Sequence, residues 1–73
     1  MPVRFDGKAL HAALDEQRTR RGLSWADVAR ETGVSVSTLT GTKRGGRLEV
    51  DGVLAMAGWL DRTVESFARR TKV

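Results

Sequence analysis

Hydroxyl groups and positive charges dominate one stretch of the chain, "GVSVSTLTGTKRGGR" at residues 33–47. Residues 33–48 carry no acidic side chain, although the chain has nine Asp and Glu residues, and further basic clusters lie at 18–21 and 69–72. Hydroxyl groups can form hydrogen bonds with polar groups of a partner, and cations can neutralise its phosphates. Such a surface is therefore suited to bind a polyanion. With a net charge of +4, nucleic acid is the leading partner, while another anionic surface or mere solubility stays open as an alternative.

The sequence offers few residues for catalysis or for metal binding. The chain has no cysteine and its single histidine is His11, so neither a disulfide nor a metal site is expected. Asp15 and Glu16 are neighbours in a predicted helix and diverge, which rules them out as an acid–base pair. The phosphate loop GxxxxGK[ST] is missing. We therefore expect no enzyme, no cofactor and no small-molecule ligand.

Local signals along the chain predict an all-α fold, a compact bundle of four to five helices. Asp6, Ser24 and Ser35 are suited to cap three helix starts, and Gly22 and Gly33 to end two helices. No apolar run reaches the ~18 residues of a membrane helix, and the first residues lack the apolar region of a signal peptide. The expected location is the cytoplasm of a prokaryotic or phage-infected cell. The helices are expected at 7–21, 24–33, 36–43, within 50–60, and from 63 onward.

A single domain accounts for most of the length. We expect an N-terminal arm at 1–5, the helical domain at 6–69 and a basic tail at 70–73, with the extreme ends loose. The residues of the fourth helix expected to face the core are Val50, Val53, Leu54, Ala57 and Leu60.

The link between the second and third predicted helices is only about three residues long, Gly33-Val34-Ser35. A link this short cannot lay two helices antiparallel, so it favours the steep crossing of a helix-turn-helix. The residues expected to hold this pair together are Val28, Ala29, Gly33, Val34 and Leu39.

The segment "SWADVARETGVSVSTLTGTKRGGRL" at 24–48 resembles the helix-turn-helix of the Cro and lambda-repressor class, the XRE family. The resemblance is carried by Ala29, Gly33 and Val34, by the run "VSxSTL" at 34–39 and by "KRG" at 43–45. It extends over about residues 6–68. It implies a lambda-repressor-like fold and sequence-specific binding of double-stranded DNA by a small transcriptional regulator, such as a repressor.

In this interpretation the third helix enters the major groove. Short side chains near its N-terminus let the backbone approach the bases, and the flanking cations fix the register on the phosphates. The expected base contacts are Val36, Ser37, Thr40 and Gly41. The expected phosphate contacts are Trp25, Thr38, Lys43, Arg44 and Arg47.

Two questions stay open in the sequence. Operator binding in this class usually uses a two-fold dimer, which we expect through the fourth and fifth helices, with Trp59 and Phe67 as candidate contacts. Trp25 and Val36 stand where family members often carry glutamine, which keeps non-specific DNA binding as an alternative. A protein-interaction module on the same fold, as in an antitoxin or antirepressor, is the other alternative.

Overall fold

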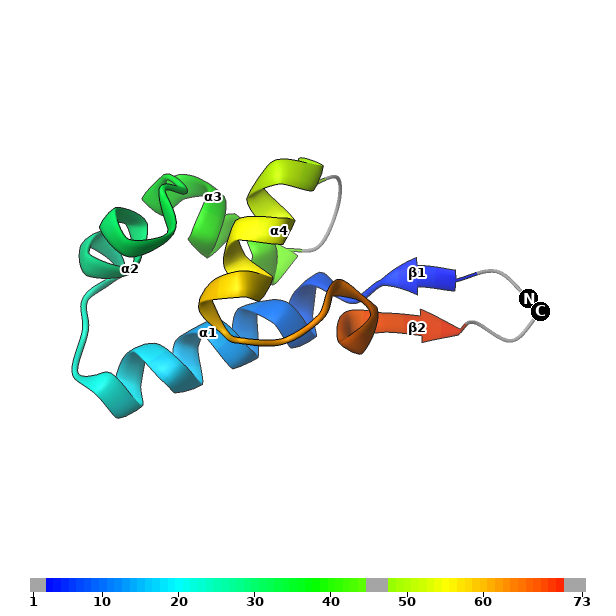
Figure 1. Cartoon of the computed structure of the whole chain (residues 1–73), viewed down its shortest axis with the longest axis horizontal. Coiled ribbons are helices and arrows are strands. Elements are labelled where there is room, and N and C mark those ends of the chain that lie inside the picture. Colours follow the sequence, from blue (N-terminus) through cyan, green and yellow to red (C-terminus); the bar gives the residue numbers. More distant parts are fainter. Residues whose placement is uncertain (1–2, 45–47, 71–73) are drawn as a thin grey trace.

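The computed structural model of the chain describes residues 3–44 and 48–70 and is mainly helical (Figure 1). In the view of Figure 1, α1 runs along the lower side of the molecule and α2, α3 and α4 lie above it. The all-α class predicted from the sequence is confirmed. The helices are α1 (Gly7–Arg21), α2 (Trp25–Thr32), α3 (Val36–Gly41) and α4 (Val50–Trp59), with 3₁₀ turns η1 (Thr42–Arg44) and η2 (Val64–Phe67).

The three predicted N-caps are present. The Asp6 carboxylate accepts the Ala9 amide at 3.0 Å. The Ser24 hydroxyl accepts the Asp27 amide at 3.1 Å while the Asp27 carboxylate accepts the Ser24 amide at 2.9 Å, which completes a capping box. The Ser35 hydroxyl caps α3 by accepting the Thr38 amide. Each cap satisfies a backbone N–H that has no partner inside the helix, so the caps fix where each helix begins.

The predicted stops are also confirmed for two helices, and α3 ends early. Gly22 and Gly33 follow α1 and α2 with φ of 68° and 77°, the left-handed conformation that glycine adopts at no steric cost. The third helix was expected to reach Lys43, but it ends at Gly41 and the chain tightens into η1. Threonine and glycine are weak helix formers, and the Thr42 hydroxyl donates to the Leu39 carbonyl at 2.7 Å, which favours the tighter turn.

A short β-ribbon adds to the helical fold. Strand β1 (Val3–Phe5) pairs antiparallel with β2 (Ala68–Arg70), and Phe5 lies opposite Ala68. The Asp6 amide continues the ribbon by donating to the Phe67 carbonyl at 2.7 Å. Residues 3–5 of the expected N-terminal arm therefore form a strand. The expected fifth helix is only the 3₁₀ turn η2, after which the chain extends into β2.

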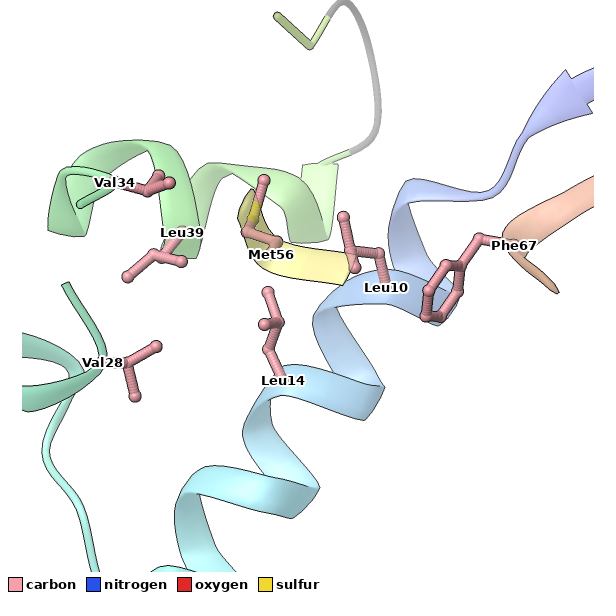
Figure 2. Close-up of a cluster of buried hydrophobic side chains, with 7 residues drawn as sticks. All are labelled: Leu10, Leu14, Val28, Val34, Leu39, Met56 and Phe67. Atoms are coloured by element: carbon pink, nitrogen blue, oxygen red, sulfur yellow. The ribbon is translucent and has the colours of Figure 1, made fainter. Parts of the chain in front are cut away.

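The core lies where α1 meets the α2–α3 pair and α4. Its buried side chains come from all of these elements and from η2 (Figure 2). They are Leu10, Leu14, Val28, Val34, Leu39, Met56 and Phe67. No helix in the described part of the chain is long and apolar enough to cross a membrane.

The inward face predicted for α4 is partly wrong. Val53 and Ala57 are buried, but Val50 is 72% exposed and Leu54 is 54% exposed. Positions 50 and 54 are one helical turn apart, so they share a face. That face points away from the core, because α4 turns Val53, Met56 and Ala57 toward it.

Candidate nucleic-acid interface

Helices α2 and α3 pack closely across the Gly33-Val34-Ser35 link. Val28 of α2 and Leu39 of α3 are both fully buried, and Val34 between the helices is 9% exposed (Figure 2). Ala29 is half-buried against the same cluster. The five residues expected to hold the pair together thus lie at or next to the contact between the two helices, which leaves the opposite face of α3 open to a partner.

The outer face of α3 carries three of the four residues expected to contact bases. Val36, Ser37 and Thr40 are exposed, while Gly41 is half-buried. The Thr40 hydroxyl donates to the Val36 carbonyl at 3.0 Å, so toward a partner it can only accept. Within the described residues the Ser37 hydroxyl has no hydrogen bond, so it is free both to donate and to accept.

Thr38 has a local role beside its expected phosphate contact. Its amide donates to the Ser35 hydroxyl at 3.2 Å, and the two hydroxyl oxygens are 2.9 Å apart. The side chain is exposed but belongs to the cap of α3. The Thr38 side chain can therefore bind a phosphate only if its hydroxyl proton is not used in the hydrogen bond with Ser35.

Ion pairs divide the arginines and lysines into two groups. Arg18, Arg20, Arg21 and Arg30 each contact a carboxylate. Their partners are Asp15, Glu16, Glu31 and Asp27 respectively. The basic cluster seen at 18–21 in the sequence is therefore largely neutralised within the chain.

The remaining cations near α3 have no such partner. Lys8, Lys43 and Arg44 are exposed and form no ion pair with any described residue. Together with His11 they line a shallow hollow of about 660 Å³ between α1 and η1. Lys43 and Arg44 were expected from the sequence, whereas Lys8 and His11 were not, because no local pattern connects them to residues 43–44.

Trp25 begins α2 and lies beside this hollow. Its ring stacks on His11 with centroids 5.4 Å apart and planes at 25°, and the Arg18 guanidinium lies 4.9 Å from the ring centroid. The indole N–H has no hydrogen-bond acceptor among the residues that the structure describes. A phosphate contact by Trp25 would use this donor. Arg47, the last expected phosphate contact, lies outside the described residues.

Acidic side chains bound the candidate surface on the side of α4. A second hollow lies between α3 and the start of α4, where Thr38, Gly41 and Arg44 face Glu49 and Asp51. Carboxylates repel phosphates, so an anionic partner is favoured over α3, η1 and α1 rather than over the start of α4.

The two side chains expected at a dimer interface are engaged inside the chain. Phe67 is 2% exposed, so it is not available to a second copy. Trp59 is half-buried, and its indole N–H donates to Glu31 Oε1 at 2.8 Å. The large apolar side chains that α4 does expose are Val50 and Leu54.

Comparison with protein-family models, with curated proteins and with solved structures found no match to this chain. Within residues 3–44 and 48–70, no three His, Cys, Asp or Glu side chains come together as metal ligands. The described side chains of the candidate surface carry hydroxyls, one imidazole, one indole and cations that form no ion pair with a described residue.

Proposed function

We propose that this protein binds double-stranded DNA through α3 and the cations that flank it, as a small transcriptional regulator with a helix-turn-helix of the Cro and lambda-repressor class. One observation carries the proposal most strongly. The exposed hydroxyl face of α3 adjoins Lys43 and Arg44, which form no ion pair with any described residue, whereas the arginines at 18, 20, 21 and 30 are paired with carboxylates. A cation that has no carboxylate partner and lies beside an exposed polar helix is available to bind a phosphate of the DNA backbone.

In the proposed complex, α3 lies in the major groove. Ser37 donates to or accepts from a base edge, Thr40 accepts from an exocyclic amine, and Val36 contacts a thymine methyl group. Gly41 adds no side chain, which lets the helix backbone approach the DNA. Lys43 and Arg44 neutralise phosphates and set the register.

Selection of bound duplexes from a random-sequence pool tests this function directly. We expect enrichment of a short site, and an Arg44→Ala variant should retain less DNA than a matched Arg20→Ala variant, because Arg20 is already paired with Glu16. Binding without enrichment would favour the non-specific alternative. No retention of duplex DNA at low salt would contradict the proposal.

We further propose that two copies associate through α4. Val50 and Leu54 are exposed on one face and border an apolar hollow with Phe5, Leu48 and Val53. A two-fold dimer would place two copies of α3 on half-sites about 34 Å apart, which doubles the number of bases read. The same exposed face is also the observation that favours the protein-interaction alternative, in which a different protein covers it.

A further inference from the structure

The hollow between α1 and η1 contains the only histidine of the chain, His11. Two contacts hold its ring, the Thr42 hydroxyl 3.2 Å from Nδ1 and the stacked Trp25 indole. Thr42 is itself fully buried. The imidazole is therefore positioned by the fold and does not sample solvent as a free surface side chain would.

The hydrogen bonds of Thr42 determine which nitrogen of His11 carries the proton. The Thr42 oxygen lies 2.7 Å from the Leu39 carbonyl oxygen, and a carbonyl cannot donate, so the hydroxyl proton lies on that contact. Thr42 must then accept from His11, which makes Nδ1 the protonated nitrogen. In the neutral ring, Nε2 is consequently a bare acceptor, and it has no partner among the described residues.

The charges around the ring are mostly positive. Lys8 lies one turn earlier on α1, and Lys43 and Arg44 come from η1. Asp15 lies one turn later on α1, but Arg18 holds its carboxylate at 2.6 Å. In the described part of the chain, no carboxylate lines this hollow.

We propose that this hollow is a subsite for one phosphate of the DNA backbone, and that His11 binds this phosphate as an imidazolium. The inference rests on the proposed function and adds to it that DNA binding takes up a proton. Neutral His11 presents a lone pair at Nε2, which repels a phosphate oxygen. A proton taken from solvent onto Nε2 turns that acceptor into a charged donor, and the phosphodiester oxygen accepts the resulting hydrogen bond.

The phosphate favours this proton uptake. A negative charge within hydrogen-bonding distance stabilises the charged form of an imidazole. Lys8, Lys43 and Arg44, which line the same hollow, add electrostatic attraction for the phosphate. His11 is the single histidine of the chain, and imidazole is the side-chain type that can take up a proton near neutrality, so proton uptake on DNA binding would make the affinity depend on pH.

The test measures the association constant for a random-sequence duplex of about two helical turns at fixed ionic strength between pH 5.5 and 8. For the wild-type chain, we expect the affinity to fall as the pH rises, by up to about tenfold per pH unit, the limit set by one proton. A His11→Asn variant keeps an N–H donor for Thr42 but cannot titrate, so its affinity should stay flat over this range. A Lys8→Ala variant should bind more weakly at every pH and keep the wild-type slope.

A second measurement uses the wild-type chain alone, so it tests the inference even if the His11→Asn variant does not fold. The ring protons of the single histidine give one set of NMR signals in the wild-type chain, and at pH 7 added duplex should move them toward the imidazolium position. Duplex binding with no pH dependence and no such movement would overturn the inference and leave the proposed function standing. No duplex binding at any pH would overturn both.

Discussion

Two neighbouring hydroxyls on α3 differ in what they can offer a partner. Thr40 gives its proton to the Val36 carbonyl, whereas the Ser37 hydroxyl is unengaged among the described residues. A base-edge contact by Ser37 therefore breaks no internal hydrogen bond, and its net gain is larger. Specificity should depend more on Ser37, and affinity more on the unpaired cations.

Substitution of Ser37 and of Arg44 should separate these two effects. Ser37→Ala should weaken binding to the selected site by about 1–3 kcal/mol and leave random duplex nearly unchanged. Arg44→Ala should weaken binding to both duplexes by a similar factor, because a phosphate contact carries no sequence information. The measurement is a pair of binding titrations at one salt concentration. Equal losses on both duplexes for both variants would show that α3 does not read bases.

Leu39 anchors α3 in the contact between α2 and α3. It is fully buried and packs in the central cluster. Leu39→Ala should lower the free energy of unfolding by about 2–5 kcal/mol, from the lost burial and the cavity left behind. Small domains are stable by about 5–15 kcal/mol, so this loss should be plain in a denaturant titration monitored by circular dichroism. An unchanged midpoint would contradict this packing.

Glu31 connects three of the helices. Its carboxylate on α2 accepts the Trp59 indole N–H of α4 at 2.8 Å and pairs with Arg21 of α1 at 2.9 Å. The hydrogen bond from Trp59, then that from Arg21, lowers the pKa of Glu31 below its usual value. Because both partners favour the charged carboxylate, the links between these helices depend on ionised Glu31.

Acid should therefore loosen this junction. A carboxylate with a lowered pKa in the folded state contributes stability that is present above its ordinary value, about 4.3, and that is lost as the pH falls below it. We expect the melting temperature to drop in this acidic range. Glu31→Gln should be less stable at pH 7 and should show a smaller drop. The remaining drop belongs partly to Asp27, whose pKa is lowered by its hydrogen bonds with the Ser24 amide and hydroxyl. An identical acid profile in both chains would contradict the role of Glu31.

The elements were predictable where their signals are local. Caps such as Ser24 and stops such as Gly33 act within one turn, so the sequence predicts them correctly. The orientation of α4 was predicted less well, because an apolar residue such as Leu54 fits either face until the neighbouring elements are placed. The β1–β2 ribbon pairs residues 3–5 with residues 68–70, which are far apart in the sequence. Strands of three residues are too short to show an alternating pattern, so the sequence did not predict this ribbon.

At the scale of the whole molecule, the candidate surface could be predicted only in part. The hydroxyls and cations of 36–44 are continuous in sequence, so their composition reveals them. Lys8 and His11 join them from a distant part of the sequence, and the hydrogen bond between His11 and Thr42 spans 31 residues. The ion pair of Arg21 with Glu31 spans ten residues, so no local pattern predicts it. The pairs of Arg18 with Asp15 and of Arg20 with Glu16 lie within one helical turn, so their spacing in the sequence could have predicted them.

Self-association through α4 gives a further prediction. A Val50→Ser, Leu54→Ser double variant should be monomeric at concentrations where the wild-type chain is dimeric, as measured by sedimentation equilibrium. Both side chains are exposed, so folding stability should stay within about 0.5 kcal/mol. Ala12→Ser, on the exposed face of α1, serves as a matched control that should leave the dimer intact. A wild-type chain that is monomeric both alone and on DNA would contradict the proposed dimer.

The most direct test of the central claim is the salt dependence of duplex binding. If Lys8, Lys43, Arg44 and Arg47 neutralise about four phosphates, log K should fall against log salt with a slope of about −3.6 for one copy. Arg44→Ala should reduce the magnitude of this slope by about 0.9, whereas Arg20→Ala should leave it unchanged because Arg20 is paired with Glu16. An affinity that stays flat between low and moderate salt, or equal slope changes in the two variants, would contradict DNA binding at this surface.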